Sequence, residues 1–137
     1  MSTAPGIGID VVTLARLERT LQRWGERFAE HVLGEDERRT WPAQGSGVAA
    51  CFAVKEAAIK ALGRRPTPFR WSRLTLLDAA VDDRISPAVG RALERAVPGA
   101  TPRFGRWAVD GRAVGTAAWC DDGELLVAVA VLDEEAG

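Results

Sequence analysis

Three charged side chains in this sequence have the types and spacing that metal or phosphate chemistry requires. Glu56 and Lys60 stand four residues apart in an alanine-rich stretch, so they share one face of the helix expected there. Such a pair is most often exposed and contributes about 0.3 kcal/mol. Alternatively, Glu56 binds a metal ion while Lys60 places its charge on a phosphate one turn away. Asp10 follows Gly6 and Gly8 at the end of an expected strand, where it is either a solvated helix cap or an oxygen ligand for a hard cation.

Other basic side chains mark two further features. Lys55 lies near the apolar side of the same expected helix, so its amino group either reaches solvent or enters a buried polar site. On the first expected helix, four arginines recur at spacings of three, four and four residues: Arg16, Arg19, Arg23 and Arg27. Such a stripe is often only a solvated helix face. Because few acidic residues neutralise it, the stripe favours contact with an acidic protein partner.

The elements that would position these side chains follow from hydrophobic periodicity. Between Gly6 and Val12, residues alternate between two faces as in a strand. Helices are expected over 13–28, 35–41, 48–62 and 86–97, and strands over 6–12, 71–79, 103–109, 112–119 and 125–132. Asp110-Gly111 suits a tight type I′ hairpin. This order predicts one α+β domain over 1–137, with helices packed on an antiparallel sheet and frayed ends at 1–5 and 134–137.

Composition excludes several classes of protein. The 137 residues are 47% hydrophobic and 27% charged, with a net charge of −1, so no basic field for nucleic acid is expected. No apolar run reaches the roughly 18 residues of a membrane span, so no membrane contact is expected. Cys51 and Cys120 form no disulfide framework or zinc pattern. With no secretion signal at the N-terminus, a reducing cytoplasm is the expected location.

Three segments of the chain, in this order, resemble the holo-acyl-carrier-protein synthases, a small type of 4′-phosphopantetheinyl transferase. They run from Gly6 to Val12, from Arg27 to Leu33 and from Phe52 to Gly63. The resemblance implies the 4′-phosphopantetheinyl transferase fold. It also implies transfer of 4′-phosphopantetheine from coenzyme A to a serine of an acyl carrier protein, with Mg²⁺ as cofactor and a homotrimer as the assembly.

The resemblance also implies roles for individual residues. Asp10 and Glu56 correspond to the magnesium ligands, and Lys60 corresponds to a contact with the pyrophosphate of coenzyme A. Lys55, on the same helix, is assigned with Lys60 to coenzyme A binding. The four arginines of the stripe would bind the acidic recognition helix of the carrier protein: Arg16, Arg19, Arg23 and Arg27.

The sequence departs from the family pattern at two places. Cys51 stands where an arginine usually precedes the phenylalanine of the third segment. The stretch from Ala117 to Asp121 stands where the family usually has Ser-x-Ser-His. Of this stretch, Asp121 is either a general base or a turn residue, and Cys120 is expected to be a small structural residue. His31, the only histidine, is expected at the surface or in a structural role.

These departures keep two other interpretations open. The chain could be a diverged homologue that binds a carrier protein, or a carrier-bound intermediate, without transferring the arm. It could also be a trimeric structural protein that retains a vestigial site. Retention of Asp10, Glu56 and Lys60 together argues against the vestigial site.

Overall fold

The computed structural model describes residues 6–40, 46–78 and 87–133. Their strands form one antiparallel sheet: β1 (Ile7–Thr13), β2 (Leu74–Asp78), β3 (Arg103–Val109), β4 (Arg112–Asp121) and β5 (Leu125–Leu132). The helices are α1 (Leu14–Trp24), α2 (Glu26–Val32), α3 (Glu35–Thr40), α4 (Ser46–Leu62) and α5 (Pro87–Ala96), and a 3₁₀ turn, η1 (Trp71–Arg73), precedes β2. The predicted α+β class, with helices on an antiparallel sheet, is confirmed.

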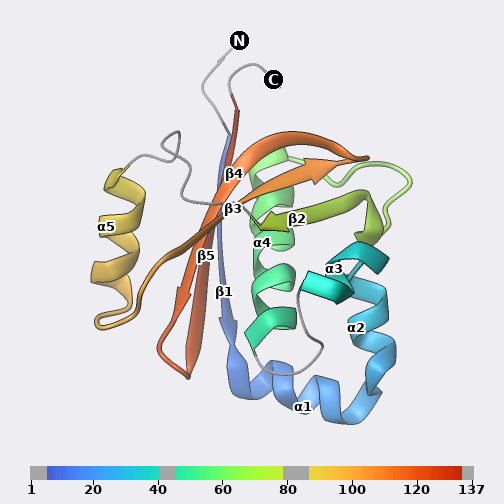
Figure 1. Ribbon diagram of the computed structural model, residues 1–137, viewed down its shortest axis with the longest axis horizontal. Coiled ribbons are helices and arrows are strands. Elements are labelled where there is room, and N and C mark those ends of the chain that lie inside the picture. The colour runs from blue at the N-terminus through green and yellow to red at the C-terminus, as the bar shows by residue number, and fades with distance from the viewer. Residues whose placement is uncertain (1–5, 41–45, 79–86, 134–137) are drawn as a thin grey trace.

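The strand order is β1-β5-β4-β3-β2, so β1 and β5 are neighbours although they lie far apart in the sequence. Helices α4 and α5 pack on opposite faces of this sheet (Figure 1). The larger core lies between α4 and the sheet and includes Val54, Trp107 and Leu126. A smaller cluster beneath α5 contains Leu93 and Cys120. The two packed faces fix β5 and β4 at the centre of the molecule.

Strand β1 approaches α4 more closely than side chains would normally allow. A Cβ atom added to Gly8 would overlap the carbonyl oxygen of Ala57, and one added to Gly6 would overlap that of Ala61. The absence of a side chain at both glycines therefore lets the strand backbone rest on the helix backbone. This contact brings Asp10, two residues after Gly8, against the same helix.

The opposite face of β1 points away from α4. Ile7, Ile9 and Val11 are 63%, 55% and 56% exposed, although the alternation predicted for this strand is present. The larger apolar side chains therefore face outward, while the glycines occupy the face against the helix. Isolated exposed apolar residues are common, but a row of three on one strand is a candidate contact surface.

Two sequence predictions about elements are confirmed in detail. The strand at 125–132 is β5, with the predicted bounds. At the β3–β4 hairpin, Asp110 and Gly111 have φ values of 51° and 82°. Two successive residues in the left-handed region are what a type I′ turn requires.

The helix predicted over 13–28 is wrong in one respect, because it is two helices. Gly25, at φ 62°, separates α1 from α2 and accepts a backbone conformation that other residues rarely adopt. Trp24 is consequently at the end of α1 and 58% exposed. The strand predicted over 71–79 begins instead with η1, and β2 starts at Leu74.

Some predictions fall outside the described residues. These are the frayed ends at 1–5 and 134–137, the last residue of the helix expected over 35–41, the first residue of the helix expected over 86–97 and the last residue of the strand expected over 71–79. Within the described ranges, no helix has the length and apolar character needed to cross a membrane.

The contact between β1 and α4 gives a first prediction. Gly8→Ala forces the strand and helix apart, and we expect the free energy of unfolding to fall by about 3 kcal/mol. Denaturant-induced unfolding, followed by circular dichroism, measures this change. Gly90→Ala on α5 is the matched control, because its added Cβ would lie 3.6 Å from the Phe104 ring, an ordinary contact. Equal stability of the two variants would contradict the prediction.

Candidate active site

A cleft of about 390 Å³ lies where β1 meets α1, α2 and α4. Its polar walls come from Asp10, Arg16 and Glu56, and its aromatic walls from Phe28 and Phe52. Two of the residues predicted to bind metal therefore face one space. Arg16 is the only member of the predicted basic stripe among the residues that line it.

Lys60 contacts β1 at Asp10, one of the residues that line the cleft. Its Nζ donates to the carbonyl oxygen of Ile9 at 2.8 Å and lies 3.2 Å from Asp10 Oδ1. The Lys60 side chain is 52% exposed, whereas that of Asp10 is mostly buried. The exposed ammonium can therefore leave Asp10 for another anion at little cost in structure.

Glu56 lies beside a second negative charge. Burial raises the pKa of Glu56 above its ordinary value, and repulsion from Asp10 raises it further. The positive charges of Arg65 and Lys60 oppose this rise. A carboxyl group whose pKa is raised by a neighbouring carboxylate gains from a cation placed between the two.

The donor set fits a magnesium ion better than a metal held by protein alone. Among the described residues, no group of three or more histidine, cysteine or acidic side chains converges on one point. Mg²⁺ is usually bound by one or two carboxylates together with substrate phosphates and waters. Asp10 and Glu56 provide two carboxylates in one cleft, with the ammonium of Lys60 already beside one of them.

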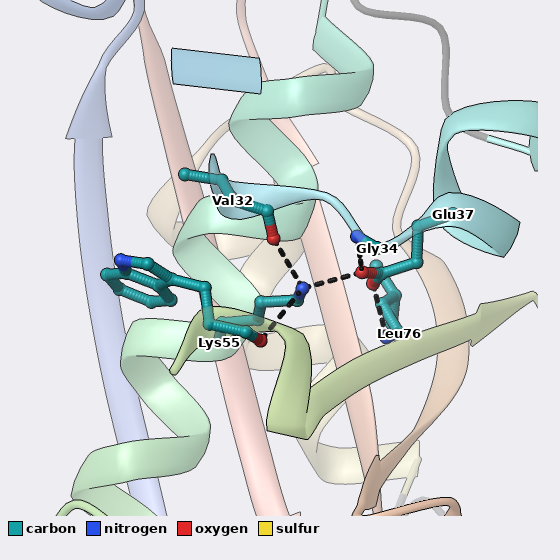
Figure 2. Close-up of polar contacts among 6 residues, drawn as sticks. Val32, Gly34, Glu37, Lys55 and Leu76 are labelled. Carbon is teal, nitrogen blue, oxygen red and sulfur yellow. Dashed lines mark hydrogen bonds and ion pairs between the residues drawn. The ribbon is translucent and has the colours of Figure 1, made fainter. Parts of the chain in front are cut away.

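Lys55, predicted to bind coenzyme A, is not brought to the cleft. Its side chain is 1% exposed and forms a buried ion pair with Glu37, with 2.6 Å between Nζ and Oε1 (Figure 2). Nζ also donates to the carbonyl oxygens of Val32, at 2.6 Å, and Trp71, at 3.4 Å. Of the two positions left open for this amino group, the structure selects the buried polar site.

The basic stripe is divided between two helices. Arg16, Arg19 and Arg23 are exposed on α1, whereas Arg27 is exposed on α2 beyond the break at Gly25. Arg23 also places its guanidinium 5.5 Å from the centre of the Trp24 ring. The arginines remain accessible to a partner, but they do not form the single straight row that one helix would give.

The end of β4 gives no catalytic geometry within one chain. Oδ1 of Asp121 accepts from the Gly123 N–H at 3.0 Å, as in a turn, and β5 separates Asp121 from Asp10. Cys120 is buried beneath α5, where burial and nearby acidic residues raise the pKa of its thiol. The prediction of a structural role for Cys120 is therefore supported. His31 is exposed on α2, as predicted for a surface residue.

Sequence reasoning missed three contributors to this region. Glu37 was not identified as the partner of Lys55, because the two residues are far apart in sequence. Arg65, which follows α4, was not identified as a charge acting on Glu56. Phe52 was not identified as a site residue, although its ring lines the cleft. A lysine on the apolar side of a helix was the one signal that pointed to a buried acid.

Cys51 stands at the position where the family that the sequence resembles usually has an arginine, and it is fully buried. Burial and the nearby carboxylate of Glu37 raise the pKa of its thiol above the usual range. A neutral buried thiol cannot provide the cation that an arginine would.

Comparison with known proteins identifies relatives of the chain. It matches the family described as the 4′-phosphopantetheinyl transferase superfamily over residues 6–116. The holo-acyl-carrier-protein synthase of Maridesulfovibrio salexigens is 42% identical over 95 residues, which cover 66% of this chain and 75% of the relative. That of Halorhodospira halophila is 46% identical over 100 residues, which cover 67% of this chain and 76% of that relative. A match to the Desulfovibrio desulfuricans enzyme, 52% identical over 59 residues, spans only 48% of that relative.

Solved structures agree with the fold. The Helicobacter pylori holo-acyl-carrier-protein synthase superposes with a TM-score of 0.67 at 21% identity, covering 93% of this chain and 99% of that one. The enzyme of Bacillus anthracis, solved in complex with CoA (3′,5′-ADP), superposes with a TM-score of 0.63 at 26% identity, and the match covers 93% of this chain and 94% of that one. The family match, the relatives and the fold lead to one conclusion: the chain belongs to the 4′-phosphopantetheinyl transferase superfamily and is of the holo-acyl-carrier-protein synthase type.

Proposed function

We propose that this chain transfers 4′-phosphopantetheine from coenzyme A to a serine of an acyl carrier protein, with Mg²⁺ bound by Asp10 and Glu56. The observation that carries the proposal is that these two carboxylates line one cleft, with Lys60 in contact with Asp10, in a chain of this family. Both cysteines in the described chain are free thiols, in keeping with the reducing cytoplasm as the location.

The reaction exchanges one phosphorus–oxygen bond for another. The serine oxygen bonds to the β-phosphorus of coenzyme A while the bond to the bridging oxygen breaks, and adenosine 3′,5′-bisphosphate leaves. A bound Mg²⁺ would neutralise the charge of the pyrophosphate. Lys60 adds a second positive charge by turning from Asp10 to a phosphate oxygen. Asp121 stays our candidate for the base that takes the serine proton, and it would act from a neighbouring subunit, because β5 separates it from Asp10.

The carrier protein is proposed to bind along α1. Arg16, Arg19 and Arg23 are exposed there, and Arg16 also lines the cleft. An acidic helix on the partner would complement this row and accelerate encounter at low ionic strength. The location of Arg16 would place the serine-bearing end of that helix next to Asp10 and Glu56.

We also propose that the active form is a homotrimer. The support is the exposed apolar row on β1. Beside it on β5 lie the half-buried Val127 and Val129, which pair with Val11 and Ile9 and also pack on the cluster beneath α5. Burial of such a surface between subunits would add apolar contact that a chain of this length lacks alone.

A second function is favoured by the environment of Cys120. The Ser-x-Ser-His stretch of the family is replaced by residues that are buried on one or the other face of the sheet or lie in a turn. A homologue that binds a carrier protein without transferring the arm would show the same substitutions. Calorimetry discriminates the two functions, because the non-transferase would bind holo-carrier while binding coenzyme A weakly or not at all.

The transferase proposal predicts that both carboxylates are required. Asp10→Asn and Glu56→Gln should each lower the rate of transfer by about 100-fold, because each removes one of the two negative charges that would bind Mg²⁺ beside the pyrophosphate. The assay incubates the chain with coenzyme A, Mg²⁺ and a panel of apo carrier proteins and measures carrier mass. Glu18→Gln, an exposed change on α1, is the control. No mass gain on any carrier with the folded wild-type chain would refute the proposal.

The raised pKa of Glu56 predicts a pH-dependent effect on stability. Since the folded state binds this proton more tightly than the unfolded state, ionisation of Glu56 lowers stability as pH rises through the raised pKa. Without metal, Glu56→Gln should therefore raise the melting temperature at about pH 7 but leave it unchanged at about pH 4. Added Mg²⁺ should stabilise only the wild type at the higher pH. Thermal unfolding by calorimetry tests both points, and an unchanged melting temperature in metal-free buffer at the higher pH would contradict them.

The trimer proposal predicts the effect of one outward-facing substitution. Ile9→Asp places a charge in the exposed apolar row, so we expect the trimer to dissociate into folded monomers with little transfer activity. Size-exclusion chromatography with light scattering gives the mass. Trp24→Asp, at another exposed apolar residue, should leave the mass unchanged. A monomeric wild-type chain would exclude the proposal.

A further inference from the structure

A buried charge pair lies behind the cleft, and the proposed reaction makes no use of it. Lys55 directly precedes Glu56 on α4, yet its side chain points into the interior and meets Glu37 of α3 (Figure 2). The two side chains are 1% and 2% exposed. Lysine and glutamate are rarely buried to this extent unless they are paired and hydrogen-bonded.

The carboxylate of Glu37 is saturated by backbone donors as well as by the lysine. Oε1 accepts from the Gly34 N–H at 2.9 Å, and Oε2 accepts from the Leu76 N–H at 2.7 Å. Glu37 thereby joins the turn between α2 and α3 to β2. With the two carbonyls that Lys55 binds, the pair connects α2, the turn after it, α3, α4, η1 and β2.

One of the carbonyls that Lys55 binds belongs to a helix that carries an aromatic ring of the cleft, and the other belongs to a residue whose ring packs on such a ring. One is the carbonyl of Trp71, whose ring lies 5.5 Å from that of Phe52, centre to centre. The Phe52 ring lies 5.9 Å from that of Phe28. The other carbonyl belongs to Val32, one helical turn after Phe28 on α2. We call Phe28, Phe52 and Trp71 the aromatic wall.

Stability alone does not account for a charge pair at this place. Apolar side chains of similar volume often replace a buried ion pair without loss of stability, because desolvation of the charges offsets their attraction. Apolar side chains cannot, however, bind a carbonyl oxygen in a fixed direction. The contribution specific to Lys55 and Glu37 is therefore the orientation of the segments that they join.

We propose that Glu37 and Lys55 are positioning residues for coenzyme A binding. The pair fixes the aromatic wall at the spacing that accepts the part of coenzyme A beyond its phosphates. Two rings of the wall, those of Phe28 and Phe52, line the cleft together with Asp10 and Glu56, and the Trp71 ring packs on that of Phe52. A substrate whose phosphates lie at the carboxylates extends along the two rings that line the cleft. The inference rests on the proposed function for the identity of the substrate, but not for the link between the pair and the wall.

The test removes both charges while keeping the lengths of both side chains. In the double variant Lys55→Met/Glu37→Gln, no unpaired charge remains buried, but the carbonyls of Val32 and Trp71 lose their donor. We expect the KM for coenzyme A to rise about tenfold while kcat stays within about twofold. The control makes the same kinds of change in the exposed α3 pair, Arg39→Met/Glu35→Gln, and should leave both constants unchanged.

A second measurement needs no activity and no ligand. Nuclear Overhauser contacts between the Trp71 and Phe52 rings report the wall directly. They should weaken in the double variant and persist in the control. If the wild-type chain fails to bind coenzyme A, the proposed function fails, and the ring contacts still decide the positioning role. Ring contacts of wild-type strength in a folded double variant, or an unchanged KM, would overturn the inference.

Glu37→Asp provides the test if the double variant does not fold. It retains the charge pair but shortens the acidic side chain, so one carboxylate can no longer reach Lys55, Gly34 and Leu76 together. We expect weakened ring contacts and a raised KM in this variant as well. Wild-type values for both measurements would overturn the inference.

Discussion

The close contact of β1 with α4 is the constraint on which the rest of the structure depends. It exists because Gly6 and Gly8 leave room for the carbonyls of Ala61 and Ala57, so that two backbones meet with no side chain between them. The alternation of the strand then sends Asp10 to the side of the helix that carries Glu56 and Lys60. It sends Ile7, Ile9 and Val11 to the other side. The polar cleft and the apolar outer face are thus two results of one packing choice.

Two lysines on α4 show how burial separates roles that look alike in sequence. The Lys60 side chain is half exposed and contacts both Asp10 and the solvent, so its charge is available to an incoming anion. Lys55 is enclosed, and its donors are taken by Glu37 and two carbonyls. In water the first interaction contributes little free energy and is easily exchanged. The second cannot be opened without leaving a charge in the interior.

Much of the fold could be predicted from the sequence, because local rules decide it. Alternation predicted β1 and an apolar run predicted β5, and Asp110-Gly111 predicted a turn that needs two left-handed residues. Gly25 marks a weak position in the helix expected over 13–28, but Arg23 and Arg27 keep their helical spacing across it, so the same rules do not decide whether the helix breaks there. A single glycine decides there between a weak helix position and a left-handed one.

The candidate site was predictable only in part, because sequence spacing does not give distances between segments. Glu56 and Lys60 could be placed on one helix face, but the contact of Lys60 with Asp10 required the strand–helix packing. The partner of Lys55 could not be identified, since Glu37 lies on a different helix, 18 residues earlier in the sequence. Asp121 was expected to be either a general base or a turn residue, and sequence alone could not decide between them. In the structure its carboxylate accepts a hydrogen bond from the Gly123 N–H, as in a turn.

The pairing of β1 with β5 has a consequence for which parts of the chain suffice to make the site. The three motifs that predicted the family lie within 6–63, yet β1 takes its hydrogen bonds in the sheet from the strand at 125–132. Leu132 donates to the Gly6 carbonyl at 2.8 Å, so the two ends of the described chain close on each other. A fragment with every recognisable motif would lack the strand that holds Asp10 in place. The cleft is therefore a property of the whole domain, formed only when contacts distant in sequence have been made.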